Sequence, residues 1–196
     1  MTTNNVSCGY LELIIGPMYA GKTSKILEVY KQCQFCNIPV AVINHTIDKR
    51  YHESMLSTHD KVMVPCILAT NLKDVWSSNK DVWYSNEYTN TLMSADVILI
   101  NEGQFFSDLY ETVQDMLNYE KKVYVCGLDG DFERKKFGSI LDLIPFCDKI
   151  TKLTSLCSIC RDGTAAIFSM RITDEKEQTV VGSTNYIPVC RKCYNK

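Results

Sequence analysis

The sequence lacks a long hydrophobic run, because its longest apolar stretches, such as LIIG and VILI, are far shorter than the roughly 20 residues that span a bilayer. It also lacks a basic excess: 21 Lys and Arg residues stand against 23 Asp and Glu residues, for a formal net charge of -2. A protein that binds nucleic acid mainly through its phosphates is usually basic. The first residues contain neither a basic start nor an apolar core, so we expect no signal peptide. These absences disfavour membrane, nucleic-acid-binding and secreted classes.

Cysteine, by contrast, is abundant, with ten in 196 residues. Because nothing indicates secretion, the Cys-x-x-Cys pairs favour metal binding in a reducing compartment over a disulfide framework. We therefore predict a cytoplasmic protein. A composition of 45% hydrophobic and 22% charged residues is typical of a globular chain with a sizeable core.

Short apolar runs alternate with amphipathic stretches, which predicts an α/β fold with a parallel sheet covered on both faces. The predicted strands are 10–15, 39–44, 96–100 and 122–126. One predicted helix covers 23–36, and a second follows Ser107 as N-cap. The apolar residues of the second helix, at helical spacing, are Leu109, Val113, Met116 and Leu117.

Helical periodicity stops near residue 150, and two short strand-like runs follow at 165–170 and 179–181. We therefore predict a nucleotide-binding domain over 1–150 and a small metal-supported β domain over 151–196. The segment 76–88 is polar and aromatic and favours no element.

A phosphate-binding motif joins the first predicted strand to the first predicted helix. Its pattern G-x-x-x-x-G-K-T, between a strand and a helix, is typical of a phosphate-loop NTPase (RecA-like) sheet. The loop amides and the helix N-terminus would bind phosphate, Lys22 would reach the β- and γ-phosphates, and Thr23 would bind Mg²⁺. The alternative is a chance Gly-rich turn. The predicted ATP-binding residues here are Gly16, Pro17, Met18, Tyr19, Ala20, Gly21, Lys22, Thr23 and Ser24.

Glu102 follows the strand 96–100 and lies where ligands of open α/β sheets bind. It could organise Mg²⁺ or act as a general base, which is worth about 10²- to 10⁴-fold in rate. The alternative is a solvated Glu in a turn. Phe105 and Phe106 favour a pocket for a flat ring, although one of them is expected to pack in the core.

Two Cys-x-x-Cys pairs near the C-terminus, Cys157 with Cys160 and Cys190 with Cys193, make a four-thiolate set. Four thiolates are typical of a closed structural Zn²⁺ site. The long segment between the pairs would form a loop pinned at its base by the metal. The alternative is unlinked buried cysteines, which is how we interpret the pair Cys33 and Cys36.

Four motifs, in order from about Tyr10 to Tyr194, resemble the cytosolic type of thymidine kinase of animal cells, bacteria and large DNA viruses. They are GPMYAGKT, EGQFF, LDGDFERKKFG and the two Cys pairs ending in VCRKCY. The resemblance implies transfer of the ATP γ-phosphate to the 5′-hydroxyl of thymidine, with Mg²⁺ and structural Zn²⁺. It also implies a homotetramer, feedback inhibition by dTTP, and a zinc-ribbon-like C-terminal domain whose long loop covers the nucleoside. Because the chain is short at both ends and divergent between motifs, we predict a viral member in the host cytoplasm.

The resemblance also implies roles for single residues. Glu102 would be the base, Asp48 and Arg50 would lie near the phosphates and metal, and Gln104 would lie near ATP. The family's base pocket maps to Met18, Phe105, Leu128, Phe132 and Phe137, with Ser169 and Tyr186 from the covering loop. Backbone groups of roughly 168–186 would hold much of the base.

Two departures from the family pattern affect these expectations. Asn101 replaces the Asp that usually precedes the catalytic Glu, so the site formed with Thr23 and Asp48 should bind Mg²⁺ more weakly. An apparent one-residue insertion after Cys160 leaves the register of Ser169 open.

Two other function classes stay open at this stage. One is a different phosphate-loop enzyme: a kinase for another deoxynucleoside or, less favoured, an ATPase motor. The other is a zinc-ribbon nucleic-acid binder with a vestigial phosphate loop, which the net charge disfavours.

Overall fold

A computed structural model describes residues 8–48, 55–57, 63–78, 87–180 and 182–196. Its centre is a six-stranded sheet in the order β5-β2-β6-β7-β1-β8, in which all neighbouring strands pair in parallel. The predicted α/β class with a parallel sheet is therefore confirmed. The strands of the sheet are β1 (Tyr10–Ile15), β2 (Val40–His45), β5 (Ile67–Ala69), β6 (Val97–Ile100), β7 (Lys122–Gly127) and β8 (Lys149–Lys152).

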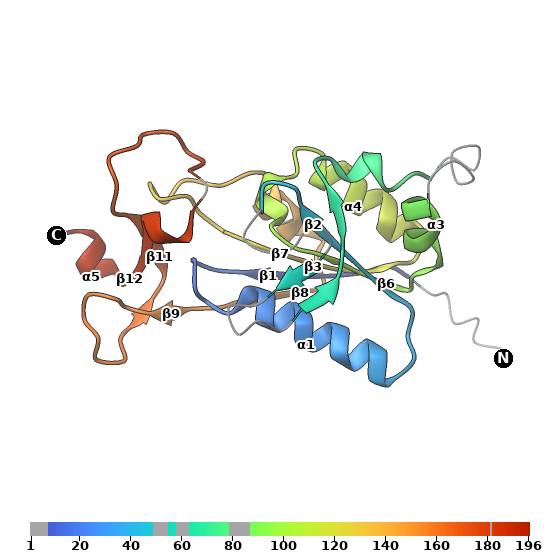
Figure 1. The fold of residues 1–196 in the computed structure, drawn as a ribbon, viewed down its shortest axis with the longest axis horizontal. Helices are drawn as coiled ribbons and strands as arrows, with labels where there is room; N and C mark the ends of the chain where they lie inside the picture. The colour runs from blue at the N-terminus through green and yellow to red at the C-terminus, as the bar shows by residue number, and fades with distance from the viewer. Residues whose placement is uncertain (1–7, 49–54, 58–62, 79–86, 181) are drawn as a thin grey trace.

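Helices cover both faces of this sheet, as Figure 1 shows, with α1 on one side and α3 and α4 on the other. The alternation of side chains along each strand creates two cores. In β1, Ile14 packs in the core on the α1 side, while Leu13 packs in the core that contains α4. The helices of this part are α1 (Lys22–Phe35), α3 (Glu87–Ser94) and α4 (Leu109–Asn118). Three 3₁₀ turns follow strands β5, β6 and β7, namely η1 (Leu72–Asp74), η2 (Gly103–Phe105) and η3 (Ile140–Phe146).

The start of α4 differs from the prediction. Its N-cap is Asp108 and not Ser107. The Asp108 carboxylate does not cap its own helix but accepts the backbone N–H groups of Leu72 (3.1 Å) and Lys73 (2.8 Å). The predicted apolar face is confirmed, because Leu109, Val113 and Met116 are fully buried.

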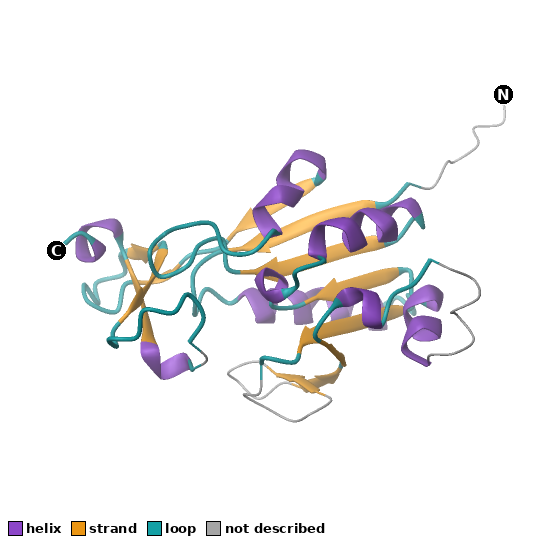
Figure 2. Ribbon diagram, turned by 90° about the horizontal axis from the view of Figure 1, so that it is seen from above, coloured by secondary structure: helices purple, strands orange, loops and turns teal. Residues whose placement is uncertain are grey.

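A short antiparallel hairpin of β3 (Met55–Ser57) and β4 (Met63–Pro65) stands outside the main sheet, and the sequence reading missed it. Figure 2 shows it at one edge of the molecule. Leu56 and Val64 are buried against the α1 side of the core, which holds the hairpin to the domain.

The C-terminal residues form a small β module beyond the carboxyl ends of the main strands (Figures 1 and 2). Strand β8 pairs with β1, so the sheet ends at Lys152 and crosses the boundary predicted near residue 150. The run predicted at 165–170 forms two strands with different partners, and Thr179 and Val180 of the second predicted run lie in a loop. The module contains β9 (Ser155–Leu156), β10 (Ala165–Ala166), β11 (Phe168–Arg171), η4 (Ser183–Asn185), β12 (Tyr186–Val189) and α5 (Arg191–Tyr194).

In the described part of the chain, no helix combines the length and hydrophobicity that crossing a membrane requires.

Candidate active site

The loop between β1 and α1 has the backbone that the phosphate-binding motif requires. Gly16 has φ 149°, and a Cβ there would lie 2.4 Å from the carbonyl oxygen of Leu153. Gly21 is the N-cap of α1 with φ 80°, a left-handed conformation that suits glycine. The ammonium group of Lys22 donates to the carbonyl oxygen of Pro17 (2.7 Å), which holds it over the loop. The loop therefore presents a cation and a helix N-terminus to one cavity.

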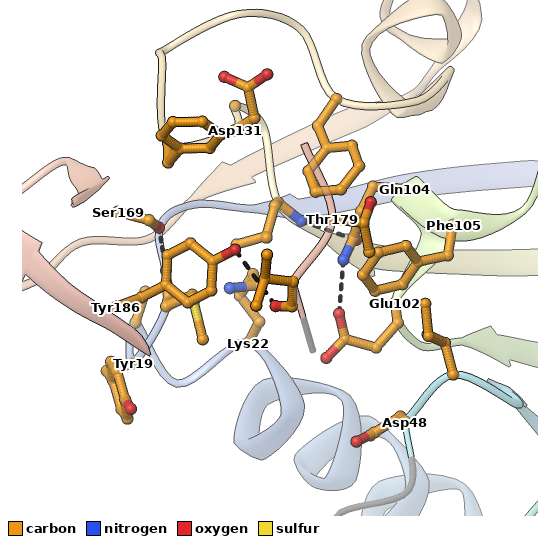
Figure 3. A pocket seen from close by; sticks show the side chains of 18 of the residues that line it. Tyr19, Lys22, Asp48, Glu102, Gln104, Phe105, Asp131, Ser169, Thr179 and Tyr186 are labelled. Atoms are coloured by element: carbon orange, nitrogen blue, oxygen red, sulfur yellow. Dashed lines mark hydrogen bonds between the residues drawn. The ribbon is translucent and has the colours of Figure 1, made fainter. Parts of the chain in front are cut away.

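One cavity joins this loop to the carboxyl ends of four neighbouring strands. Residues after β1, β2, β6 and β7 meet there because the strands are parallel. Figure 3 shows Lys22, Glu102 and Tyr186 lying around it from three different segments. The predicted site residues that line it are Met18, Tyr19, Ala20, Gly21, Lys22, Thr23, Ser24, Asp48, Glu102, Gln104, Phe105, Leu128, Phe132, Phe137, Ser169 and Tyr186.

A buried glutamine orients the Glu102 carboxylate in this cavity. Glu102 itself has φ 55°, a left-handed backbone that is unusual for a residue with a side chain. Its Oε2 accepts a hydrogen bond from Gln104 Nε2 (2.7 Å), and Gln104 Oε1 accepts the backbone N–H of Leu128 (3.0 Å). The N–H donor of Leu128 determines which end of the Gln104 amide is oxygen, so its NH₂ must face Glu102. Figure 3 shows this chain of contacts.

Gln104, which the resemblance places near ATP, lines the same cavity as the phosphate loop and also contacts the proposed base. It is 3% exposed and lies between Glu102 and β7, although one edge of it lines the cavity.

Asn101 is placed away from the cavity. It is 1% exposed, its Nδ2 donates to Asn44 Oδ1 (2.9 Å), and its Oδ1 accepts the thiol of Cys126 (3.0 Å). Because β6 lies between β2 and β7, the side chain of Asn101 bonds to one residue of each of these two strands. The prediction that Asn101 belongs to the magnesium site is not supported by this placement.

Two oxygen donors for Mg²⁺ do line the cavity, namely the hydroxyl of Thr23 and the carboxylate of Asp48. Hydroxyl and carboxylate oxygens suit a hard cation, so these residues fit the ion. Asn44 Nδ2 donates to Asp48 Oδ2 at 3.4 Å, which links Asp48 to the Asn44–Asn101 pair. Arg50, which was expected beside Asp48 near the phosphates and metal, lies outside the described residues.

Aromatic rings form the apolar wall of the cavity. The rings of Phe105 and Phe137 meet edge-to-face with centroids 5.4 Å apart. Behind them, Phe106 is 1% exposed and packs against His45, so it is the core member of the pair, as predicted. Burial lowers the pKa of His45, and its Nδ1 accepts the backbone N–H of Ile47 (3.1 Å), so the ring is held in place behind this wall.

The C-terminal module completes the cavity. Ser169 of β11 is 5% exposed, and its Oγ accepts the backbone N–H of Met18 (2.9 Å), which joins the module to the phosphate loop. The hydroxyl of Tyr186 donates to the carbonyl oxygen of Val180 (3.3 Å) and so holds the covering loop beside the ring.

Sequence reasoning did not single out seven further residues that line the cavity, namely Ile47, Gly130, Asp131, Gln178, Thr179, Val180 and Gly182. Ile47 follows β2, and the other six lie in the LDGDFERKKFG segment or the loop 168–186, so their position was a usable signal.

The four predicted cysteines gather in the same module. The sulfur atoms of Cys157, Cys160, Cys190 and Cys193 all lie within 4.8 Å of one another. Four ligands placed 2.3 Å from a tetrahedral zinc would be separated by about 3.8 Å, so the cluster fits Zn²⁺. The backbone N–H of Cys160, aided by that of Cys190, lowers the pKa of the Cys157 thiol to about 6.

The third Cys pair lies elsewhere. Cys33 is buried in the core on the α1 side, as the packing interpretation predicted, whereas Cys36 is exposed.

The family model for thymidine kinase matches residues 9–194. The chain belongs to the thymidine kinase family. It is 39% identical to the thymidine kinase of Sheeppox virus, over 95% of this chain and 97% of the relative. It is 38% identical to that of Vaccinia virus, over 95% and 97%, and 36% identical to thymidine kinase 1 of Dictyostelium discoideum, over 95% and 78%. The family resemblance expected from the four motifs is confirmed, and its members include viral and cellular proteins.

Proposed function

We propose that this protein is a thymidine kinase, which transfers the γ-phosphoryl group of ATP to the 5′-hydroxyl of thymidine and releases ADP and dTMP. The observation that carries the proposal is a single cavity lined by the phosphate loop, an oriented carboxylate and an aromatic wall. A nucleoside and a triphosphate can meet there at the carboxyl edge of the sheet. Membership of the family supports the same reaction.

Phosphoryl transfer needs positioning, charge stabilisation and one base. The loop amides, the N-terminus of α1 and Lys22 bind the phosphates. The carboxylate of Glu102 takes the proton of the 5′-hydroxyl while the 5′-oxygen of thymidine forms the new bond to the γ-phosphorus. The bond between that phosphorus and the bridging oxygen of ADP breaks, and ADP keeps the electron pair.

Thr23 and Asp48 would hold Mg²⁺, which would neutralise charge on the phosphates. The uncharged Asn101 lies one residue before Glu102 but is engaged with Asn44 and Cys126. Of the residues proposed to hold the metal, Asp48 therefore supplies the negative charge.

The thymine base fits between flat apolar walls and a few polar groups. Phe105, Phe137 and Leu128 form one wall, and Met18 and Tyr186 contribute from the phosphate loop and the module. Phe132 and Ser169 complete the lining. The backbone of the loop 172–180 would supply polar contacts to the edge of the base.

The family resemblance also supports four wider proposals. The protein acts as a homotetramer, is inhibited by its end product dTTP, works in the cytoplasm, and divides into an ATP-binding part and a zinc-supported part. Zn²⁺ on the four cysteines would hold the two ends of the module together. Sedimentation of the zinc-loaded protein and inhibition by dTTP test the first two.

The deciding experiment is transfer from labelled ATP with Mg²⁺ to thymidine, deoxycytidine, deoxyadenosine and deoxyguanosine in parallel. The Glu102→Gln variant keeps the shape of the side chain and removes the base, so it should lose about 10²- to 10⁴-fold in kcat. Zinc content and melting temperature of the variant should match those of the wild type. Preferred transfer to another nucleoside would replace thymidine as the substrate, and no transfer to any of the four would overturn the kinase proposal.

A further inference from the structure

Asp131 is a buried carboxylate that the proposed reaction does not use. It is 6% exposed, and its Oδ1 accepts the backbone N–H groups of Glu133 and Lys135, both at 2.9 Å. The two bonds close the turn between Gly130 and Lys136, which pair as an isolated bridge. Asp131 is therefore fixed by its own turn, and its Oδ2 remains available to another segment.

The turn that carries Asp131 is itself tied to the C-terminal helix of the module. The hydroxyl of Tyr194 donates to the carbonyl oxygen of Phe132. The guanidinium of Arg134 lies 4.3 Å from the Tyr194 ring centroid and donates to Asn195 Oδ1 (3.0 Å). Because α5 contains Cys193, this turn is a rigid support and not a free loop.

The loop after β11 is organised by one side chain. Arg171 Nη1 donates to the carbonyl oxygens of Glu175 (2.7 Å) and Glu177 (2.6 Å), and its Nη2 donates to that of Gln178 (3.2 Å). Its guanidinium also lies 3.7 Å from the centroid of the Phe132 ring. Residues 172–178 are thereby held as one unit by the planar donor fork of arginine.

One side-chain hydrogen bond joins this unit to the rigid support. Gln178 Nε2 donates to Asp131 Oδ2 at 2.7 Å, and both residues line the cavity. We propose that Asp131 and Gln178 are positioning residues that hold the loop closed over the bound nucleoside. That the enclosed ligand is thymidine rests on the proposed function, whereas the closure itself does not.

The consequence is an effect on nucleoside retention. A hydrogen bond to a charged group contributes more than a neutral one, enough for about a 10-fold change in a binding constant. Neither residue contacts Glu102 or Lys22 in the hydrogen bonds that the structure shows, so the change should fall on the KM for thymidine more than on kcat.

Gln178→Glu is the decisive variant, because it places a second carboxylate against Asp131. The KM for thymidine should rise about 10-fold, and amide hydrogens of 172–180 should exchange faster even without nucleoside. The double variant Asp131→Asn with Gln178→Glu restores a donor and an acceptor with their roles exchanged. The introduced amide keeps an oxygen for Glu133 and Lys135, so both readouts should return to within about threefold of the wild type.

Glu177→Gln is the matched control, because it alters the charge of the adjacent exposed side chain, which does not line the cavity. It should behave as the wild type in both measurements. Wild-type exchange and KM in Gln178→Glu would overturn the proposal, as would a double variant no better than the single one. If the double variant does not fold, Gln178→Ala decides, with faster exchange expected and wild-type exchange overturning the proposal. Should thymidine not be a substrate at all, the proposed function fails while the exchange measurement still tests the closure.

Discussion

At the residue scale, the site depends on polar side chains that hold other side chains. Gln104 accepts the backbone N–H of Leu128, the residue after β7, and donates from its NH₂ to Glu102. Glu102 sits in a left-handed backbone conformation, which aims its side chain at the cavity. A general base works only when its oxygen is within reach of the proton, so Gln104 is a positioning residue for the proposed base.

Replacing Gln104 with Met, which is similar in length and makes no hydrogen bond, should free the Glu102 carboxylate. We expect kcat to fall about 10- to 100-fold while the KM for ATP changes little, because misplacing a reacting group by about 1 Å can cost 10²-fold. Steady-state kinetics with both substrates measure kcat and the KM for ATP separately, and a melting curve checks the fold. A fall in ATP affinity with no fall in kcat would return Gln104 to the role near ATP that the resemblance implies.

At the element scale, the phosphate loop and strand β8 constrain each other. Gly16 begins the β1–α1 connection and lies against the backbone of Leu153, the residue immediately after β8. The N–H of Leu153 also donates to the carbonyl oxygen of Ile15 (2.8 Å). Because the approach is backbone to backbone, no side-chain movement can relieve a clash there.

Gly16→Ala should therefore lower the free energy of unfolding by about 2 kcal/mol or more, since it adds a clash to an unfavourable φ. Gly163→Ala is the control, because Gly163 also has a positive φ of 90° but its Cβ would meet nothing within 4 Å. Urea unfolding gives the free energy lost in each variant, and the difference between the two losses is the effect of the clash beyond that of backbone strain. Equal losses in both would show that the contact with Leu153 has no energetic effect.

At the scale of the whole molecule, the C-terminal module connects the zinc cluster to the nucleoside side of the cavity. β11 and β12 carry Ser169 and Tyr186 into the cavity and pack in the same small core as the cysteines. That core contains few residues, so a bound metal would supply much of its stability.

Cys190→Ser should abolish zinc binding and release β11 and β12. We expect at least a 10-fold loss of thymidine affinity while an ATP analogue binds within a few-fold of wild type, because the phosphate loop belongs to the larger sheet. Metal analysis and two separate binding titrations make the comparison, with Cys36→Ser as the control for an exposed cysteine outside the cluster. Equal loss of both ligands would mean that the module also supports the phosphate loop.

The sequence by itself determined the features that depend on local pattern. These features are the apolar runs of β1 and β6, the helical spacing of apolar residues in α4, the glycine spacing of the phosphate loop and the two Cys pairs. Each involves residues close together in the chain, so its physical meaning is visible without a structure. The covering loop and most of the base pocket were also predicted, through the family resemblance. Errors at this level were Asp108 in place of Ser107 as N-cap and two strands where one was expected over 165–170. A loop also stands at Thr179 and Val180 where a strand was expected, and the β3–β4 hairpin was missed.

Only the tertiary structure decided which polar groups face each other. The family resemblance placed Asn101 at the metal, but Asn44 and Cys126 on the neighbouring strands bond to both ends of its amide. Ser169 and Met18, 151 positions apart, meet because β11 returns to the phosphate loop. The contact of Gln178 with Asp131 has the same origin. Hydrogen bonds of this kind depend on distances between segments remote in the chain, and no local pattern encodes those distances.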